Sequence, residues 1–287
     1  MKNRNHIRHT FVPFFTLLFL FTSSCKKIED RFTVITLPPI ENEEGITQFK
    51  AELTGDTPDE SGFIYSTDAM PSLENGATKA ESNGVVGNLI TELVTLEPGT
   101  NYYVRAYVSY KDETLYGNEI NFKTNYVLGQ DYAGGKIAYF AEPGEAGYIE
   151  GEQHGLILST TIGIAKEWGC LGTEVEATET TYGSGQANTN KILAGCGEAN
   201  TAAVLCDNYE IEGYTDWYLP SYRELLNIDG NFDKMGGTYT GIYHWTSSQA
   251  SATKAWAIYL RDDAFLGSAP DTFVKNFEYY VVAVRSF

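Results

Sequence analysis

Short apolar stretches separated by turn residues fill the chain from about Phe32 to Thr124, and no helical period runs through them. This pattern predicts antiparallel strands, and several of them at such spacing predict a β-sandwich over residues 33–124. In the clearest stretch, every second side chain from Tyr102 to Val108 lies on one face. The predicted strands are Ile46–Leu53, Gly62–Ser66, Asn88–Leu93, Tyr102–Tyr110 and Asn118–Thr124.

The composition is that of a folded, acidic protein. Hydrophobic residues make up 43% and charged residues 20%, so the bulk of the chain is neither disordered nor fibrous. With 20 Lys and Arg against 38 Asp and Glu, the net charge is −18. Such a charge repels phosphate backbones, and we therefore expect no nucleic-acid partner.

The first 24 residues have the three parts of a secretory signal peptide. A basic segment with Lys2, Arg4 and Arg8 precedes an apolar run, Phe11–Phe21, which is too short to span a bilayer permanently. Small residues then precede Cys25, in an order similar to a bacterial lipoprotein signal, and this resemblance implies a lipid on Cys25. The alternative is ordinary cleavage that leaves a free thiol.

Cleavage and anchoring define the mature chain. Loss of three basic residues lowers their number from 20 to 17 against 38 acidic ones, so the net charge becomes −21. Residues 25–32 form a tether, and its charged segment is similar to the one that sends some Bacteroidota lipoproteins to the outer face. We expect a lipid-anchored outer-membrane protein that is exposed at the cell surface.

The end of the first unit resembles a known module. Leu96–Ala106 is similar to the corner between the last strands of fibronectin type III domains, which are immunoglobulin-like sandwiches. The resemblance implies that Leu96 plugs the core, that Gly99 permits the turn, and that the Tyr102 hydroxyl bonds back to the backbone. Tyr116–Thr124 is similar to the final strand. Such a module acts as a spacer or interaction unit.

A second unit follows the link Asn125–Asp131 and covers residues 132–287. Its predicted strands, at both ends of a helix-compatible region, indicate an α+β domain whose ends pair in one sheet. Tyr279–Ser286 is predicted as one central strand, because Tyr279–Val284 is apolar on both faces. The predicted strands are Gly135–Phe140, Gly155–Ser159, Ala255–Leu260 and Tyr279–Ser286.

Four segments of this unit resemble one family in order and spacing. They are Gly183–Thr189, Gly213–Leu225, Tyr243–Ser248 and Val282–Phe287. The family is the C-terminal domain first described in a Legionella collagen-like adhesin. The resemblance implies a C-type-lectin-like fold that binds ligands at its surface more often than it catalyses reactions.

Most residues of these segments also have a structural interpretation. Ser221 and Glu224 form a capping box, which predicts a helix start and not an acid catalyst at Glu224. Asp216 is predicted to order a loop, and Trp217 to lie in the core. We expect Trp245 and Trp256 to be mostly buried, because both lie in apolar or strand-like stretches. If either is exposed, it becomes a platform for sugar rings. Arg285 belongs to the terminal segment of the family pattern.

Three cysteines remain beyond Cys25. Along one straight helix, Cys196 and Cys206 would lie about 15 Å apart, too far for a disulfide. Gly195 and Gly197 are expected to break that helix, so we favour a Cys196–Cys206 bridge with Cys170 free. A catalytic Cys170 is the alternative, because formylglycine-generating enzymes share a distantly similar fold.

No motif assigns catalysis or a metal. His154 and His244 lie far apart and lack metal-ligand spacing, and Ser247 and Ser248 lack the context of a nucleophile elbow. We expect no cofactor. A calcium-binding loop at Asp262-Asp263 is the alternative, although the sequence has no DxDxDG pattern.

These features predict an adhesin-like surface protein and not an enzyme. The sandwich holds the C-terminal domain off the membrane, and that domain binds a carbohydrate or a host or matrix glycoconjugate. Two alternatives stay open: a structural or assembly component of the envelope or fimbriae that binds a protein partner, and a hydrolase or thiol-dependent oxidase. The sequence names no ligand-binding residues, because specificity lies in the variable loops.

Overall fold

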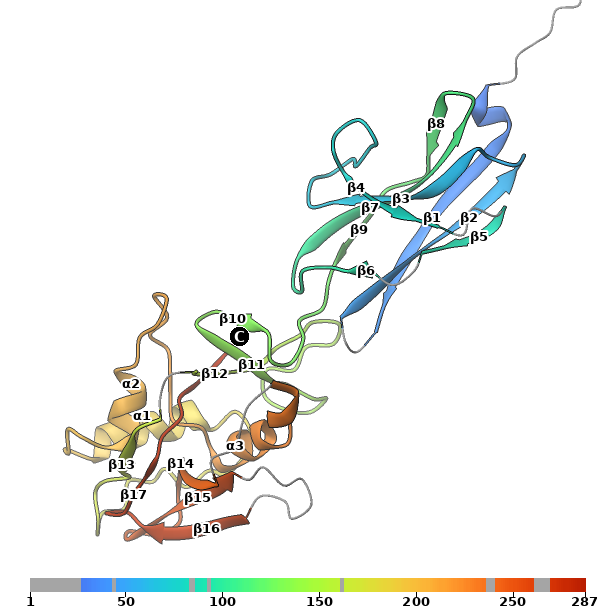
Figure 1. Cartoon of the computed structure of the whole chain (residues 1–287). Coiled ribbons are helices and arrows are strands. Elements are labelled where there is room, and N and C mark those ends of the chain that lie inside the picture. The colour runs from blue at the N-terminus through green and yellow to red at the C-terminus, as the bar shows by residue number, and fades with distance from the viewer. Residues whose placement is uncertain are drawn as a thin grey trace, which may run out of the picture.

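The computed structural model describes residues 27–42, 45–82, 86–91, 94–160, 163–235, 241–260 and 269–287. Figure 1 shows two halves at the two ends of an elongated molecule. The described residues are mostly β, with 44% in strands and 13% in helices, and the α-helices lie in the C-terminal half.

Two antiparallel sheets build the N-terminal half. One has the order β1-β2-β5, with β6 also paired to β2; the other has the order β4-β3-β7-β8, with β9 also paired to β7. The bounds are η1 (Ile28–Asp30), β1 (Phe32–Glu41), β2 (Ile46–Gly55), β3 (Glu60–Ser66), β4 (Thr78–Glu81), β5 (Gly87–Ile90), β6 (Val94–Thr95), β7 (Asn101–Tyr110), β8 (Glu113–Tyr116) and β9 (Ile120–Lys123). All five strands predicted in this region overlap an observed one.

The core of this half lies between the two sheets. Phe49 and Leu53 of β2 pack with Phe63 of β3 and Val104 of β7, and each is at most 1% exposed. The alternation of β7 follows the sequence, because its four predicted core side chains from Tyr102 to Val108 are all buried. The Tyr102 hydroxyl accepts a hydrogen bond from the Glu97 amide at 3.3 Å, so the predicted corner contact is present.

Two further sheets build the C-terminal half. Their orders are β10-β11-β12-β18 and β13-β17-β14-β15-β16. The strand bounds are β10 (Asp131–Tyr132), β11 (Gly135–Phe140), β12 (Gly155–Leu158), β13 (Ala165–Glu167), β14 (Ile242–Gln249), β15 (Lys254–Leu260), β16 (Ala269–Val274), β17 (Glu278–Tyr280) and β18 (Val284–Ser286). Because β18 pairs with β12, the two ends of this half share one sheet, as predicted.

The predicted single strand Tyr279–Ser286 is wrong. The chain leaves one sheet after β17 and joins the other at β18. Between them, the Val281 amide bonds to the carbonyl of Ile164 at 3.2 Å, and the Ala283 amide bonds to the Ser159 hydroxyl at 3.1 Å. The apolar residues of Tyr279–Val284 are therefore explained by a segment that passes from one sheet to the other, and not by one continuous strand.

Three short α-helices and one 3₁₀ helix pack on these sheets. They are α1 (Gly185–Gly195), α2 (Ala202–Asp207), α3 (Tyr222–Asp229) and η2 (Phe232–Met235). The main core joins helix residues Ile192 and Cys206 with Trp168, Trp217 and Trp245, all three of which are at most 1% exposed. A smaller cluster joins Leu225 of α3 with Ile258 and Leu260 of β15.

Candidate functional site

A cleft of about 630 Å³ lies where the two halves meet. We call it the junction cleft. Its walls come from the end of β9 and the link after it, the start of the C-terminal half, the segment before β12, and the end of the chain at β18. The lining residues are Lys123, Thr124, Asn125, Tyr126, Tyr132, Ala133, Gly151, Glu152, Gln153, His154, Tyr214, Arg285 and Phe287.

One wall is aromatic. The rings of Tyr126, Tyr132 and Phe287 contact one another, with centroids 4.8 to 5.7 Å apart. The Tyr126 hydroxyl donates to that of Tyr132 at 3.2 Å, and the Lys123 ammonium lies 4.9 Å from the centroid of the Tyr126 ring. All three rings are partly exposed, so they present apolar surface to the cleft.

Arg285 forms a second wall together with Tyr214. Its guanidinium lies 4.1 Å from the Tyr214 ring centroid and bonds both carboxylate oxygens of Asp216, at 2.7 and 2.9 Å. These bonds hold the pKa of Asp216 below its ordinary value. A third bond goes to the carbonyl of Ala133 at 3.4 Å. The predicted loop-ordering role of Asp216 is therefore exerted through Arg285.

Planar polar side chains complete the cleft. The Gln153 amide pairs with the Tyr126 backbone, accepting from its N–H at 2.6 Å and donating to its C=O at 3.1 Å. The His154 ring lies between Glu152 Oε2 and the carbonyl of Phe287, at 3.1 Å from each. Fixed polar groups beside ring faces suit a ligand with hydroxyl groups and one apolar face.

Of the residues that line the cleft, Arg285 was named from the sequence as a motif residue, and His154 was named only to discount a metal site; Asp216, also named, holds Arg285 without lining the cleft itself. Tyr126 and Tyr132 stand in or beside the link, whereas Tyr214 and Phe287 lie far along the chain. Only the pairing of the two ends of the C-terminal half brings them together. The one signal for this in the sequence is the prediction that those ends share a sheet.

The other named motif residues form a buried polar network beneath α1 and α3. The capping box at α3 is present, since Ser221 accepts from the Glu224 amide and Glu224 accepts from the Ser221 amide. Thr189 bonds the backbone of Leu219 in both directions, and Ser248 donates to the carbonyl of Glu179 at 2.7 Å. These residues tie the irregular segment before α1 to β14 and α3.

Glu224 is completely buried within this network. Its oxygens accept from the amides of Gly183 at 3.0 Å and Ser221 at 2.7 Å, while burial raises the pKa of its carboxyl. Trp217 and Trp245 are buried as expected, but Trp256 is only partly buried and contacts the Tyr222 ring at 5.3 Å.

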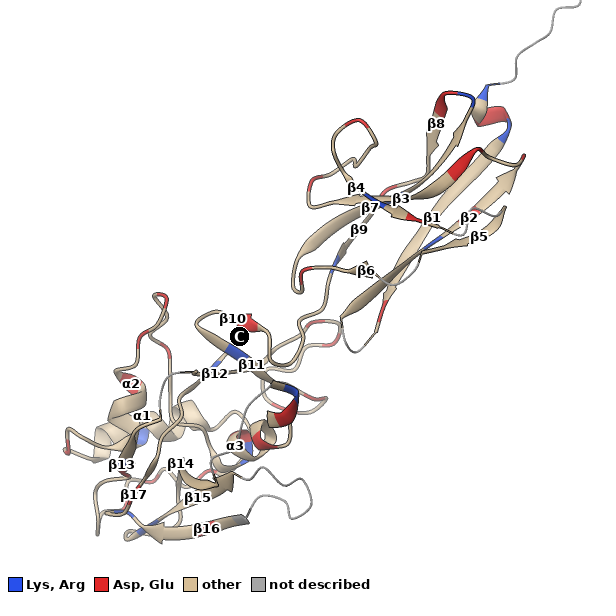
Figure 2. Ribbon diagram, viewed as in Figure 1, with Lys and Arg blue, Asp and Glu red and all other residues tan. Residues whose placement is uncertain are grey.

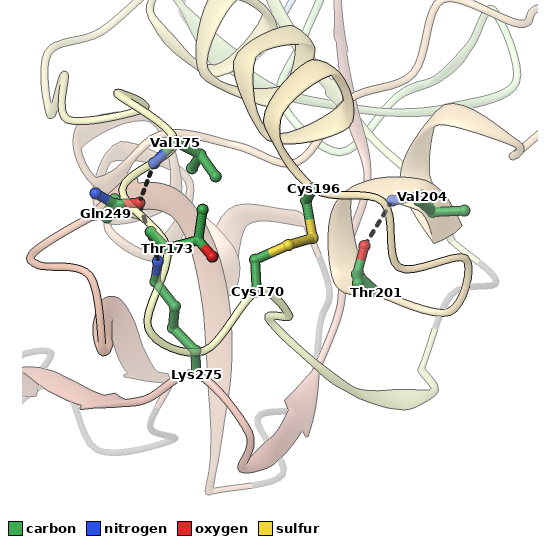
Figure 3. Close-up of a disulfide and its surroundings, with 8 residues drawn as sticks. All are labelled: Cys170, Thr173, Val175, Cys196, Thr201, Val204, Gln249 and Lys275. Atoms are coloured by element: carbon green, nitrogen blue, oxygen red, sulfur yellow. Dashed lines mark hydrogen bonds between the residues drawn. A yellow bond between two sulfur atoms is a disulfide. The ribbon is translucent and has the colours of Figure 1, made fainter.

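The predicted Cys196–Cys206 disulfide is wrong. Cys196 bonds to Cys170, with a Cα–Cα distance of 5.6 Å (Figure 3). The helix α1 ends at Gly195, so Cys196 leaves the helix and meets the loop after β13. Cys206 instead points into the core from α2, where burial raises the pKa of its thiol. Neither Cys170 nor Cys206 is thus a reactive thiolate in this structure.

A buried lysine lies near the disulfide (Figure 3). The Lys275 ammonium donates to the carbonyl of Thr173 at 2.8 Å and to Gln249 Oε1 at 3.0 Å, and lies 4.4 Å from the Trp168 ring centroid. Gln249 Oε1 also accepts from the Val175 amide. Burial lowers the pKa of Lys275 to about 8.

Two predicted sites lie outside the described residues: the lipid-anchor residue Cys25 and the calcium-binding alternative at Asp262-Asp263. Within the described ranges, the one cluster with metal-ligating groups is Cys170, Cys196 and Glu198. Both sulfur atoms of that cluster are taken by the disulfide. Burial lowers the pKa of His244 to about 4, so this histidine is neutral at pH 7.

No protein-family model matches the chain, and neither a curated protein nor a solved structure matches it. The two family resemblances therefore stay predictions. Among the described residues, no helix is long and apolar enough to cross a membrane.

Proposed function

We propose that the protein is a lipid-anchored surface protein that binds a carbohydrate in the junction cleft. The observation that carries the proposal is the cleft itself, where aromatic rings lie beside fixed planar groups on Arg285, Gln153 and Glu152. Pyranose rings have apolar faces that pack on aromatic rings, and their hydroxyl groups bond to carboxylate, amide and guanidinium groups. A cleft of this volume is in the range typical of ligand sites.

The proposed architecture assigns one task to each half. The N-terminal half is a fibronectin type III-like spacer, supported by its two packed sheets and the Tyr102 corner contact. The C-terminal half is a C-type-lectin-like recognition domain, supported by the four sequence segments, which are joined by hydrogen bonds of Thr189, Ser248 and Ser286. The lipoprotein-like signal ending at Cys25 supports a place on the outer membrane.

Charge limits the ligand. The mature chain is strongly acidic, and Lys and Arg are scattered along the ribbon of the described residues (Figure 2). Within the cleft, Arg285 is neutralised by Asp216, and the His154 ring lies beside Glu152. Polyanionic chains such as sulfated glycans are therefore disfavoured, and a glycan of low charge is the proposed ligand.

A glycan-array screen of the chain from Lys26 onward tests this function, in calcium and in chelator. We expect one defined set of glycans to bind, and Tyr214→Ala or Glu152→Ala to abolish that binding. The matched control is Tyr148→Ala, since Tyr148 is exposed but does not line the cleft. Loss of the signal in chelator would indicate a calcium loop such as Asp262-Asp263.

A blank array in both buffers would contradict the carbohydrate proposal. An envelope pull-down that returned one stoichiometric protein would then support the alternative of a structural or assembly component.

A further inference from the structure

A smaller hollow of about 200 Å³ adjoins the junction cleft. We call it the recess. His154 and Phe287 line both hollows, so these two residues form a partition between them. The remaining walls of the recess include Ala146-Gly147, Tyr182-Gly183, Glu224 and Ser286.

We propose that the junction cleft and the recess form one groove that holds two consecutive units of a neutral oligosaccharide, one unit in each hollow. This inference rests on the proposed function, because it names the length and charge of the carbohydrate that the same site binds.

The partition is a fixed part of the fold. The Phe287 amide donates to the carbonyl of Gly155 at 3.1 Å, and the Gly155 amide donates back to that of Phe287 at 3.3 Å. The His154 ring bonds to the same Phe287 carbonyl at 3.1 Å. A ligand that fills both hollows must therefore cross a rigid rim, and a linkage between two rings fits such a crossing better than one ring does.

The recess offers hydroxyl groups to a ligand. No hydrogen bond joins the partly buried Tyr182 hydroxyl to another group in the part of the chain that the structure describes. Ser286 is exposed, and its hydroxyl lies 3.1 Å from that of Tyr218. Hydroxyl groups both donate and accept, so Tyr182 and Ser286 suit the hydroxyl groups of a sugar.

The charges around the recess favour a neutral sugar. Glu224 lines it, and no Lys or Arg does so among the described residues. Burial raises the pKa of Tyr182, and the charges of Glu224 and Glu145 raise it further. These carboxylates would repel a uronate or sulfated unit at this position.

Isothermal titration of neutral oligosaccharides of one, two and four units tests the proposal. The probes are length-matched series of glucose, galactose, mannose, xylose and N-acetylglucosamine, added to the chain from Lys26 onward. In the series that binds, we expect the Kd to fall about tenfold from one unit to two, and to change little from two units to four.

Two recess variants separate the hollows. Tyr182→Phe removes the free hydroxyl and Ala146→Leu narrows the recess, so each should abolish the gain from one unit to two and leave the affinity for one unit unchanged. Tyr148→Phe is the matched control, since Tyr148 lines neither hollow. Far-ultraviolet circular dichroism checks that both variants fold.

The two proposals fail differently. Equal affinity for one and two units, or an undiminished gain in both recess variants, would overturn the two-hollow groove and leave the cleft as a binding site. Absence of binding in every series would overturn both.

Discussion

The side chain of Arg285 lines the junction cleft and is also held in place by contacts with its neighbours in the fold. Its guanidinium stacks on Tyr214 while it bonds both oxygens of Asp216, and the side chain is only 11% exposed. A planar guanidinium matches a carboxylate in this two-bond geometry, whereas the ammonium of a lysine does not. Arg285 therefore orders the loop that contains Tyr214 and Asp216.

Replacement of this ion pair should destabilise the fold in a pH-dependent way. Because the Asp216 carboxyl has a lowered pKa, its contribution to stability is complete above the pKa of the unfolded chain, and is lost as the pH falls through the lower folded pKa. We expect Asp216→Asn to lower the free energy of unfolding by about 1 kcal/mol at pH 7, with a smaller loss at acidic pH, where the Asp216 carboxyl is protonated in the folded protein. Urea denaturation across this pH range measures the change.

Asp68→Asn is the matched control, since Asp68 is exposed and its carboxylate forms no ion pair in the described chain. Arg285→Lys should not restore the stability. An equal loss at both pH values would contradict the role of the Asp216 charge.

Burial of the Lys275 ammonium in the core makes its charged form less favourable than in water. It is fully buried, and its pKa is lowered to about 8 from an ordinary 10.5. Between these two pKa values, Lys275 binds its proton more fully in the unfolded chain than in the folded protein. The free energy of unfolding therefore rises with pH in this range. A neutral amine still has two hydrogens for the Thr173 carbonyl and Gln249.

Comparison with Lys275→Met isolates this effect. From pH 7 to 10, wild-type stability should increase relative to the variant by up to about 3 kcal/mol, since one pKa unit corresponds to about 1.4 kcal/mol. Urea denaturation of both proteins measures the difference, in which the other titrating groups cancel. A difference that stays constant with pH would rule out a lowered pKa.

At the scale of elements, the sequence predicted best where local chemistry decides the structure. The capping box sets the start of α3, and the alternation of β7 sets its buried face. No strand was predicted at β1, where the Pro38-Pro39 pair argues against one. The structure accommodates this pair with a register shift between Leu37 and Ile40.

The disulfide and the cleft depend on contacts that local patterns do not encode. Cys170 and Cys196 are separated by 26 residues, and their approach requires the complete path of the loop after β13. The rings of Tyr126 and Phe287 meet only because β18 returns to β12. Burial of one side chain can be predicted from its neighbours in the sequence, but a wall built from distant segments cannot.

The disulfide should stabilise the C-terminal half by restricting the unfolded chain. For a loop of this length, we expect Cys170→Ser/Cys196→Ser to lose about 3 kcal/mol, with a lower Tm in thermal unfolding. A reductant should lower the Tm of the wild type and leave that of the double variant unchanged. Cys206→Ser is the control, and its response to reductant should match that of the wild type. An unchanged Tm on reduction would contradict this role.

At the scale of the whole molecule, the link is a joint and not a loose tether. The Asn125 amide bonds to Glu41 of β1 at 2.9 Å, and the Gln130 side chain bonds to the carbonyl of Pro98 at 3.4 Å. Tyr126 lies against Gly99 on one side and pairs with Gln153 on the other. Asn125, Tyr126 and Gln153 also line the junction cleft, so the joint and the proposed binding site share these three residues.

Gly99→Ala tests this coupling. A Cβ at Gly99 would lie 2.2 Å from the Tyr126 ring, in a backbone with φ of +68°. Gly76→Ala is the matched control, because Gly76 has φ of +78° and open space around it. Both variants introduce similar backbone strain, of about 1 kcal/mol, but only Gly99→Ala displaces Tyr126.

We therefore expect Gly99→Ala to lose more stability than Gly76→Ala, because it disturbs the contacts of Tyr126 as well as the backbone, and it alone should broaden the distribution of dimensions in small-angle scattering. The same variant should weaken glycan binding, because Tyr126 forms part of the aromatic wall. If the two variants scattered alike and bound alike, Tyr126 would not set the arrangement of the two halves.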